Sequence, residues 1–177
     1  MTRISFKEDD ISKAPALELL QKLGYTYISP DEALAMRGGK MSNVLLEDVL
    51  RNQLRELNSI KADGYKVARF SEQNIENGVT AMRNVPMEGG YISGNEAVYN
   101  MLTLGKAFEQ SMDGDKKSKT MQYIDWEHPE NNVYHVTEEF AVTRTGSADT
   151  YRPDIVLFVN GIPLVVIECK RPDVKGA

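Results

Sequence analysis

Two apolar runs near the end of the sequence constrain the fold more than any other feature. Residues 155–159 (IVLFV) and 162–169 (IPLVVIEC) are joined by Asn160 and Gly161, a pair typical of a tight turn between antiparallel strands. Both runs lack the alternation of apolar and polar residues that marks a strand with one solvated face. The sequence therefore predicts a β-hairpin that lies in the middle of a sheet or is covered on both faces.

Charged residues lie at the ends of these apolar runs. Asp154 precedes the first run, and Glu168 and Lys170 lie at the end of the second. Glu168 and Lys170 are two positions apart and share one face of a strand, whereas Cys169 points the other way and is predicted to be a small core residue. Because unpaired charges are costly to bury, the three charged residues need a partner or a metal.

The length of the turn decides whether Asp154 and Glu168 share a face. With a two-residue loop, the pairing parity sends the two carboxylates to opposite faces of the sheet. If Gly161 instead closes a three-residue loop with a bulge, Phe158 pairs with Ile162 and the parity reverses. We predict this second register, in which the shared face holds Asp154, Val166, Glu168 and Lys170. A two-residue turn with no bulge between residues 154 and 168 would remove the shared site.

The remainder of the chain predicts helices first and strands second, which is typical of an α+β fold. Helical spacing and capping residues predict helices at 9–25 (cap Asp9 or Asp10), 42–58 (cap Ser42), 71–86 and 95–104. Residues 89–94 predict a turn, and residues 113–119 predict a flexible lysine-rich connection. Strands are predicted at 25–29, 104–110, 119–126 and 133–143. We expect one domain over residues 1–177, with a central mixed sheet flanked by helices.

Composition excludes several classes of function. The single cysteine rules out an internal disulfide, and the two histidines lack zinc-ligand spacing. The formal net charge of −5, from 21 basic and 26 acidic residues, is not that of a domain that holds nucleic acid alone. The sequence has no run of about 20 apolar residues and no apolar core in its first segment (MTRISFKEDD), so we expect a cytoplasmic protein with no membrane partner.

Two carboxylates and a nearby backbone carbonyl form a hard oxygen site that suits Mg²⁺ or Mn²⁺. A metal there would polarise a scissile phosphate and activate water, which indicates phosphodiester hydrolysis. Lys170 is expected to orient that water and offset charge in the transition state rather than act as the base, because its resting form is charged. The alternative from these residues alone is a structural ion pair between Asp154 and Lys170.

The order Pro-Asp, apolar strand, turn, apolar strand and Glu-Cys-Lys resembles the PD-(D/E)xK nuclease superfamily. Residues 125–172, with Asp-Trp, Asn-Asn-x-Tyr, Arg-Pro-Asp and Asn-Gly-x-Pro-Leu pieces, are similar to the N-terminal nuclease region of the restriction (R) subunit of type I restriction-modification enzymes, and LELLQKLGY and VLLEDVLRNQL agree. The resemblance implies a restriction-endonuclease-like fold whose catalytic residues are Asp154, Glu168 and Lys170. It also implies a metal held by Asp154, Glu168 and the backbone carbonyl of Cys169.

The resemblance extends to residues around this triplet. The family tends to place an acidic residue of the first core helix near the metal; Glu8, Glu18 and Glu47 are candidates, and we favour Glu8. Arg152 and Arg171 flank the site and are candidates for contacts with DNA phosphate. Two aromatic residues are expected to be core or packing residues rather than base-stacking ones, namely Trp126 and Tyr134.

The sequence departs from the family after the Glu-x-Lys strand. The superfamily fold continues there with a helix and usually another strand, and this family with a Gln-x-x-x-Tyr element, whereas the printed chain stops at Ala177. No Gly-x-x-x-x-Gly-Lys phosphate loop occurs in the sequence. We therefore expect an N-terminal fragment, truncated at the C-terminal end of its fold, of a longer subunit whose helicase domains use ATP.

The function implied by the resemblance is Mg²⁺-dependent cleavage of double-stranded DNA with little sequence preference. Target recognition would belong to partner methylation and specificity subunits, and the sequence agrees because it has no recognition helix rich in Arg and Asn. The alternative is a non-catalytic assembly module that docks the motor domains. Asp154→Asn separates the two, because it should abolish metal binding and cleavage in the first and only perturb stability in the second.

Overall fold

The computed structural model describes residues 12–61, 67–112, 115–144, 146–147 and 149–170 of the chain. Contacts divide the chain into two compact units, which we call the sheet unit (Met1–Leu46 with Tyr134–Ala177) and the insert unit (Glu47–Val133). A single restriction-endonuclease-like domain over residues 1–177 stays a prediction. Within the described ranges, no helix is long and apolar enough to cross a membrane.

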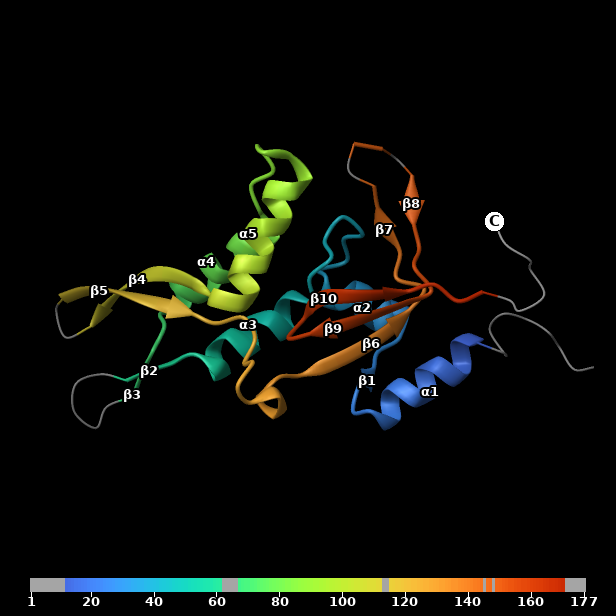
Figure 1. Ribbon diagram of the computed structural model, residues 1–177, viewed down its shortest axis with the longest axis horizontal. Coiled ribbons are helices and arrows are strands. Elements are labelled where there is room, and N and C mark those ends of the chain that lie inside the picture. Colours follow the sequence, from blue (N-terminus) through green and yellow to red (C-terminus); the bar gives the residue numbers. More distant parts are fainter. Residues whose placement is uncertain (1–11, 62–66, 113–114, 145, 148, 171–177) are drawn as a thin grey trace, which may run out of the picture. The chain divides into compact units, whose positions relative to one another are not determined.

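The sheet unit contains a mixed four-stranded sheet. Its strands, in spatial order, are β1 (Thr26–Tyr27), β6 (Tyr134–Glu138), β9 (Ile155–Val159) and β10 (Ile162–Ile167) (Figure 1). β1 runs parallel to β6, whereas the β6–β9 and β9–β10 pairs are antiparallel. Two short strands, β7 (Val142–Thr143) and β8 (Thr150–Tyr151), form a separate ribbon. With the helices, these strands confirm the predicted α+β class.

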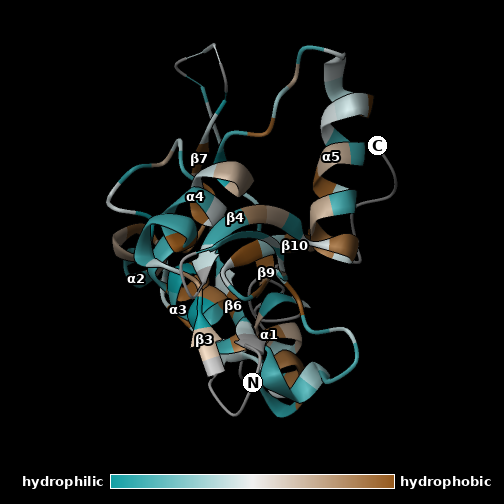
Figure 2. Ribbon diagram, turned by 90° about the vertical axis from the view of Figure 1, so that its left-hand side faces the viewer, coloured by the Kyte–Doolittle hydropathy of each residue, from teal (hydrophilic) through white to brown (hydrophobic). Residues whose placement is uncertain are grey.

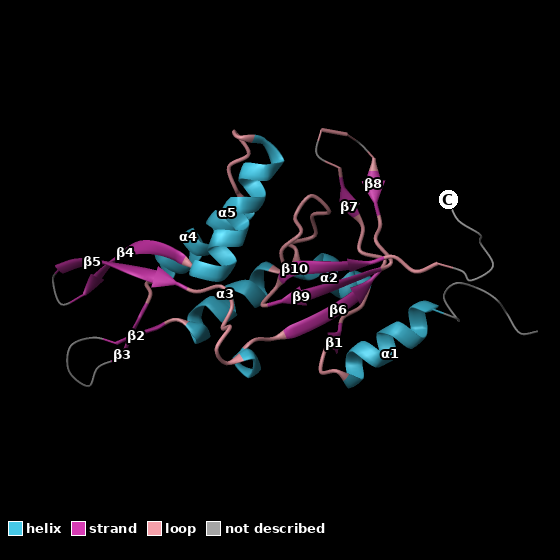
Figure 3. Ribbon diagram, viewed as in Figure 1, coloured by secondary structure: helices cyan, strands magenta, loops and turns pink. Residues whose placement is uncertain are grey.

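Helix α1 (Ala14–Lys22) packs its apolar side against this sheet (Figure 3). Pro15 lies in its first turn, where the missing N–H breaks no helical hydrogen bond, and Gly24 follows its end at φ 101°, a conformation that favours glycine. The packed cluster consists of Leu17, Val136, Ile155, Leu157 and Cys169. Because Ile155 and Leu157 are two apart on β9, this cluster defines one face of the sheet.

Helix α2 (Pro30–Met36) begins with a capping box. The Ser29 hydroxyl accepts a hydrogen bond from the Glu32 amide at 3.3 Å, and the Glu32 carboxylate accepts one from the Ser29 amide at 2.7 Å. At the other end of α2, the buried guanidinium of Arg37 lies 4.0 Å from the centroid of the Phe140 ring. Phe140 packs edge-on against Phe158 of β9 with ring centroids 5.3 Å apart. The segment after β6 is therefore packed between α2 and β9.

The insert unit contains, in its described part, helices α3 (Glu47–Leu57), α4 (Glu72–Arg83) and α5 (Gly90–Leu104) and the hairpins β2 (Ser59–Lys61)–β3 (Val67–Arg69) and β4 (Lys106–Met112)–β5 (Asp115–Met121). α3 packs against α4, and a Cβ on Gly78 would lie 3.1 Å from Leu54. Ion pairs join the two helices, namely Arg51 with Glu76, Arg55 with Glu72 and Arg83 with Glu47. The interface is thus apolar inside and charged at its rim.

Helix α5 buries little of its apolar surface. Only Gly94 and Met101 are buried along it, and Tyr91 and Ile92 are 82% and 84% exposed. Figure 2 shows hydrophobic segments along this helix. The prediction of a turn at residues 89–94 is wrong, because the helix already begins at Gly90.

Three further boundaries differ from the predictions. Ser42 does not cap α3, which begins at Glu47, because residues 41–46 form turns and irregular structure and the Leu46 amide donates to the Gly161 carbonyl at 2.9 Å. Residues 115–119, predicted to be flexible, belong to β5. The strand predicted at 133–143 breaks at Glu139, which has φ 50°. The caps predicted at residues 9 and 10 lie outside the described residues.

Leu54→Ala should lower the free energy of unfolding of the insert unit by about 2–5 kcal/mol, because it empties a fully buried site between α3 and α4. Leu104→Ala, at a position 68% exposed, is the matched control and should change that free energy by about 0.5 kcal/mol or less. Urea denaturation of both variants measures the difference. Equal losses would contradict the packing described.

Candidate functional site

The β9–β10 hairpin closes with a two-residue turn. Asn160 and Gly161 have φ 53° and 81°, and Val159 pairs with Ile162. Positive φ at both central residues is the pattern of a type I′ turn, which matches the twist of the flanking strands. The predicted three-residue loop, with Phe158 opposite Ile162, is therefore wrong.

A β-bulge further along the hairpin brings Asp154 and Glu168 to the same face of the sheet, as predicted. Pairing shifts between Pro163 and Val165, so Leu164 is the extra residue and Ile167 lies opposite Ile155. One residue further, the same register places Asp154 opposite Glu168. The two carboxylates therefore share one face of the sheet, as predicted, but the bulge that puts them there is at Leu164 and not at the turn.

Hydrogen bonds hold both carboxylates in place. The Cys169 amide donates to Oδ2 of Asp154 at 2.7 Å, and the Tyr151 hydroxyl donates to Oε1 of Glu168. This bond to Glu168 is the main reason that the pKa of Tyr151 is raised, with burial and the negative charges of Glu168 and Asp154 adding to it. The Cys169 side chain lies in the α1 cluster, which confirms its predicted core position. Lys170 is exposed and makes no ion pair with a described residue.

Glu139 is a neighbour of this site that the sequence interpretation missed. Its amide donates to the Asp154 carbonyl at 3.0 Å, and its carboxylate accepts hydrogen bonds from Lys13 Nζ at 2.7 Å and pairs with Arg152 Nε at 2.7 Å. Glu138 also contacts Lys13, at 3.3 Å. The signal in the sequence was the pair of adjacent glutamates, Glu138 and Glu139, which interrupts the strand pattern two residues after Val136.

Strand β10 is more exposed than predicted. The prediction that the hairpin lies in the middle of a sheet or is covered on both faces is wrong for β10. This strand is at the edge of the described sheet, and its apolar residues Leu164, Val165 and Val166 are 39%, 44% and 53% exposed. They line a hollow of about 290 Å³ together with Tyr151 and other mostly apolar side chains. This edge is open to a further strand or to another protein surface.

The remaining candidate residues are dispersed. Glu8 and Arg171 lie outside the described residues, and Glu18 is exposed on α1. Glu47 belongs to the insert unit, where it pairs with Arg83 at 2.7 Å. Two aromatic residues complete the set: Tyr134 packs against Tyr25 as predicted, with ring centroids 5.6 Å apart, whereas Trp126 is 58% exposed and so is not a core residue.

The donor set at Asp154 and Glu168 fits a hard divalent cation. In each carboxylate one oxygen accepts the hydrogen bond described above, and the other makes none with a described residue. Among the described residues no group of three or more His, Cys, Asp or Glu side chains is placed to hold a metal. Mg²⁺ needs no such group, since it binds through one or two carboxylates, water and substrate phosphate.

Comparison with known proteins gives a consistent family. The family model described as "Type I restriction enzyme R protein N terminus" matches residues 5–177. The type I restriction enzyme HindI endonuclease subunit of Haemophilus influenzae is 28% identical over 169 residues, which are 93% of this chain and 15% of the relative. The putative type I restriction enzyme MjaIXP endonuclease subunit of Methanocaldococcus jannaschii is 26% identical over 169 residues, with the same coverage of 93% and 15%. The chain thus spans about 15% of the length of these relatives.

Glu168→Gln should lower the pKa of Tyr151 toward the ordinary value of about 10, because it removes the charged acceptor that disfavours the phenolate. An NMR titration of ¹³C-labelled tyrosine rings measures this shift. Glu138→Gln is the matched control, because Glu138 accepts the hydroxyl of Tyr27 at 2.8 Å and should leave Tyr151 unchanged. A Tyr151 titration that is the same in Glu168→Gln would mean that the two side chains are not in contact.

Proposed function

This chain belongs to the family of type I restriction enzyme R protein N termini, and from this membership we propose that it is the nuclease domain of such an R subunit. Its reaction is hydrolysis of phosphodiester bonds in double-stranded DNA with Mg²⁺ or Mn²⁺. The observation that supports this proposal best is the bulge at Leu164, which places Asp154 and Glu168 on one face. Two carboxylates at the end of an apolar hairpin have no structural need to face each other.

The residues of the proposed site have different roles, namely to bind the metal, to orient its ligands and to stabilise the transition state. Asp154, Glu168 and the backbone carbonyl of Cys169 would hold the cation, which supplies a Lewis acid for the scissile phosphate and activates water. The Cys169 amide fixes one oxygen of Asp154 and leaves the other free to bind. Tyr151 orients Glu168 in the same way. Lys170, which is exposed, would orient the attacking water and offset the charge that grows on the phosphate.

Other parts of the enzyme would supply DNA binding and energy. A domain with a net charge of −5 is poorly suited to hold DNA alone, and the relatives are far longer than this chain. We propose that helicase domains of the same subunit translocate DNA with ATP and that methylation and specificity subunits select the target. Arg152, which pairs with Glu139 at 2.7 Å, would contact DNA phosphate only after leaving that carboxylate.

A second function is favoured by a different observation. The apolar, exposed edge of β10 suits a module that docks the motor domains of the complex without cleaving DNA. In that case Asp154 only joins the ends of the hairpin.

Asp154→Asn should abolish saturable Mn²⁺ binding, because it removes one of two carboxylate ligands while keeping the size of the side chain. Isothermal titration calorimetry on the chain and the variant measures the binding. Asp149→Asn is the control, since this carboxylate of the same unit accepts the Ser147 hydroxyl at 2.8 Å and bonds no other described side chain. Unchanged binding in Asp154→Asn would exclude the proposed metal site, and no binding by the unaltered chain would favour docking.

Lys170→Met should keep Mn²⁺ binding and reduce cleavage by about 100-fold or more, because the lysine acts on the transition state and not on the metal. Nicking of supercoiled plasmid in Mn²⁺ measures the rate, and calorimetry measures the binding. A nicking rate equal to that of the unaltered chain would remove Lys170 from the mechanism. Metal binding without any nicking by the unaltered chain would favour the docking function.

A further inference from the structure

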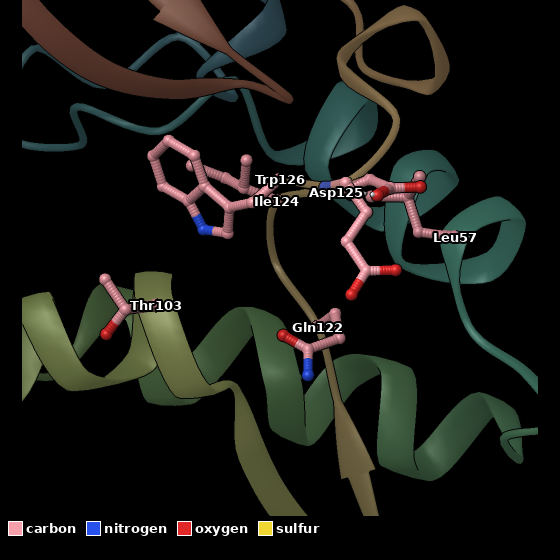
Figure 4. Close-up of a pocket in the computed structure, with 7 residues that line it drawn as sticks. Leu57, Thr103, Gln122, Ile124, Asp125 and Trp126 are labelled. Atoms are coloured by element: carbon pink, nitrogen blue, oxygen red, sulfur yellow. Dashed lines mark hydrogen bonds between the residues drawn. The ribbon is translucent and has the colours of Figure 1, made fainter.

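A pocket of about 360 Å³ lies in the insert unit (Figure 4). It is lined by Leu57 at the end of α3, by Thr103 of α5, by Gln122 and by residues 124–127. In Figure 4, Thr103 and Gln122 lie across the pocket from Trp126. All of these residues belong to one compact unit.

Trp126 presents a fixed aromatic face to this pocket. Its indole Nε1 donates to the Leu102 carbonyl at 2.7 Å, yet the residue is 58% exposed. A tryptophan held at one edge and open at its face loses little conformational entropy when a ligand stacks on it. On α5, next to Thr103, the exposed apolar residues Tyr99 and Leu104 extend the surface available to a larger ligand.

The charges that line the pocket are negative. Asp125 accepts hydrogen bonds from the amides of Glu127 and His128 at 3.2 and 2.9 Å and from Asn131 Nδ2 at 2.8 Å. The pKa of Asp125 is lowered mainly by the hydrogen bond from Asn131, and the amide bonds and the nearby His128 add to this effect. The carboxylate therefore stays ionised. Neither Asp125 nor Glu127 makes an ion pair with a described residue, and no lysine or arginine is among the described residues that line the pocket.

We propose that this pocket binds the guanidinium group of an arginine from a protein partner. Guanidinium is planar, stacks on indole and donates several hydrogen bonds to carboxylates, so it satisfies the indole face and the acids together. The side-chain amide of Gln122 makes no hydrogen bond with a described residue and offers a further acceptor. DNA phosphate is repelled by the same carboxylates. The pocket is therefore a protein-docking site, independent of the proposed nuclease reaction.

Trp126 is the only tryptophan in the chain, so its fluorescence reports on this pocket alone. We would titrate the chain with N-acetylarginine methylamide and with its neutral isostere N-acetylcitrulline methylamide at constant ionic strength. The arginine compound should give a saturable change with a dissociation constant in the millimolar range, and the citrulline compound should give none. No saturation with arginine, or equal changes with both compounds, would overturn the proposal.

Two variants test whether the arginine compound binds in this pocket. Glu127→Gln should weaken arginine binding by about threefold to tenfold, because it removes a carboxylate beside the indole. Glu130→Gln is the matched control, since Glu130 contacts His128 and does not line the pocket. Thermal unfolding of both variants checks that the insert unit stays folded. Equal weakening in the two variants would show that the effect is general electrostatics and would overturn the site.

Peptides distinguish a protein partner from a small guanidinium ligand. The acetylated tripeptide amide Leu-Arg-Leu should bind more tightly than Gly-Arg-Gly, because leucines can cover Tyr99 and Leu104 on α5. Equal affinities would limit the pocket to a small cation and would contradict docking of a protein surface.

Discussion

The hydrogen bond from the Cys169 amide to Asp154 joins the two ends of the β9–β10 hairpin, and the geometry of the candidate site depends on it. The bond forms because the Cys169 side chain is buried against α1 while its amide faces Asp154. The apolar cluster around Leu17 and Ile155 thus fixes the position of a carboxylate that is not part of it. Packing on one face of the sheet therefore positions the Asp154 carboxylate on the other face.

Glu139 provides a second connection to the same residue. Its left-handed φ of 50° is costly for a side chain larger than glycine, and the surrounding bonds compensate for that cost. The amide bond to the Asp154 carbonyl and the ion pairs with Lys13 and Arg152 all depend on this conformation. Lys13 is only 9% exposed, so the two glutamates that contact it also offset the desolvation of its charge. The start of α1 and the end of β6 are joined in this way next to Asp154.

The sequence predicted that Asp154 and Glu168 share a face, but it did not predict the β-bulge at Leu164 that makes them do so. Successive side chains along a strand point to opposite faces of the sheet, so the register of β9 and β10 decides whether Asp154 and Glu168 share a face. A site that uses both carboxylates needs the register in which they do. Asn160 and Gly161 satisfy the local preference for a type I′ turn, and the remaining parity error is absorbed at Leu164. Pro163, which precedes the bulge, is a residue that strands tolerate mainly at edges and bulges. The position of Glu139 and the late start of α3 depend on tertiary hydrogen bonds, so local propensity does not predict them.

The charge distribution separates two kinds of surface within one acidic chain. In the sheet unit, the carboxylates lie among cations, because Lys13 and Arg152 pair with Glu139 and Lys170 follows Glu168. At the pocket beside Trp126, the carboxylates have no cation among the lining residues that the structure describes. Mixed charge suits a site where phosphate and metal must approach together, whereas unopposed negative charge repels a nucleic acid backbone and attracts basic protein surfaces. If the chain cuts DNA as proposed, other domains must hold the duplex, and the proposed arginine pocket would be a means of attaching to them.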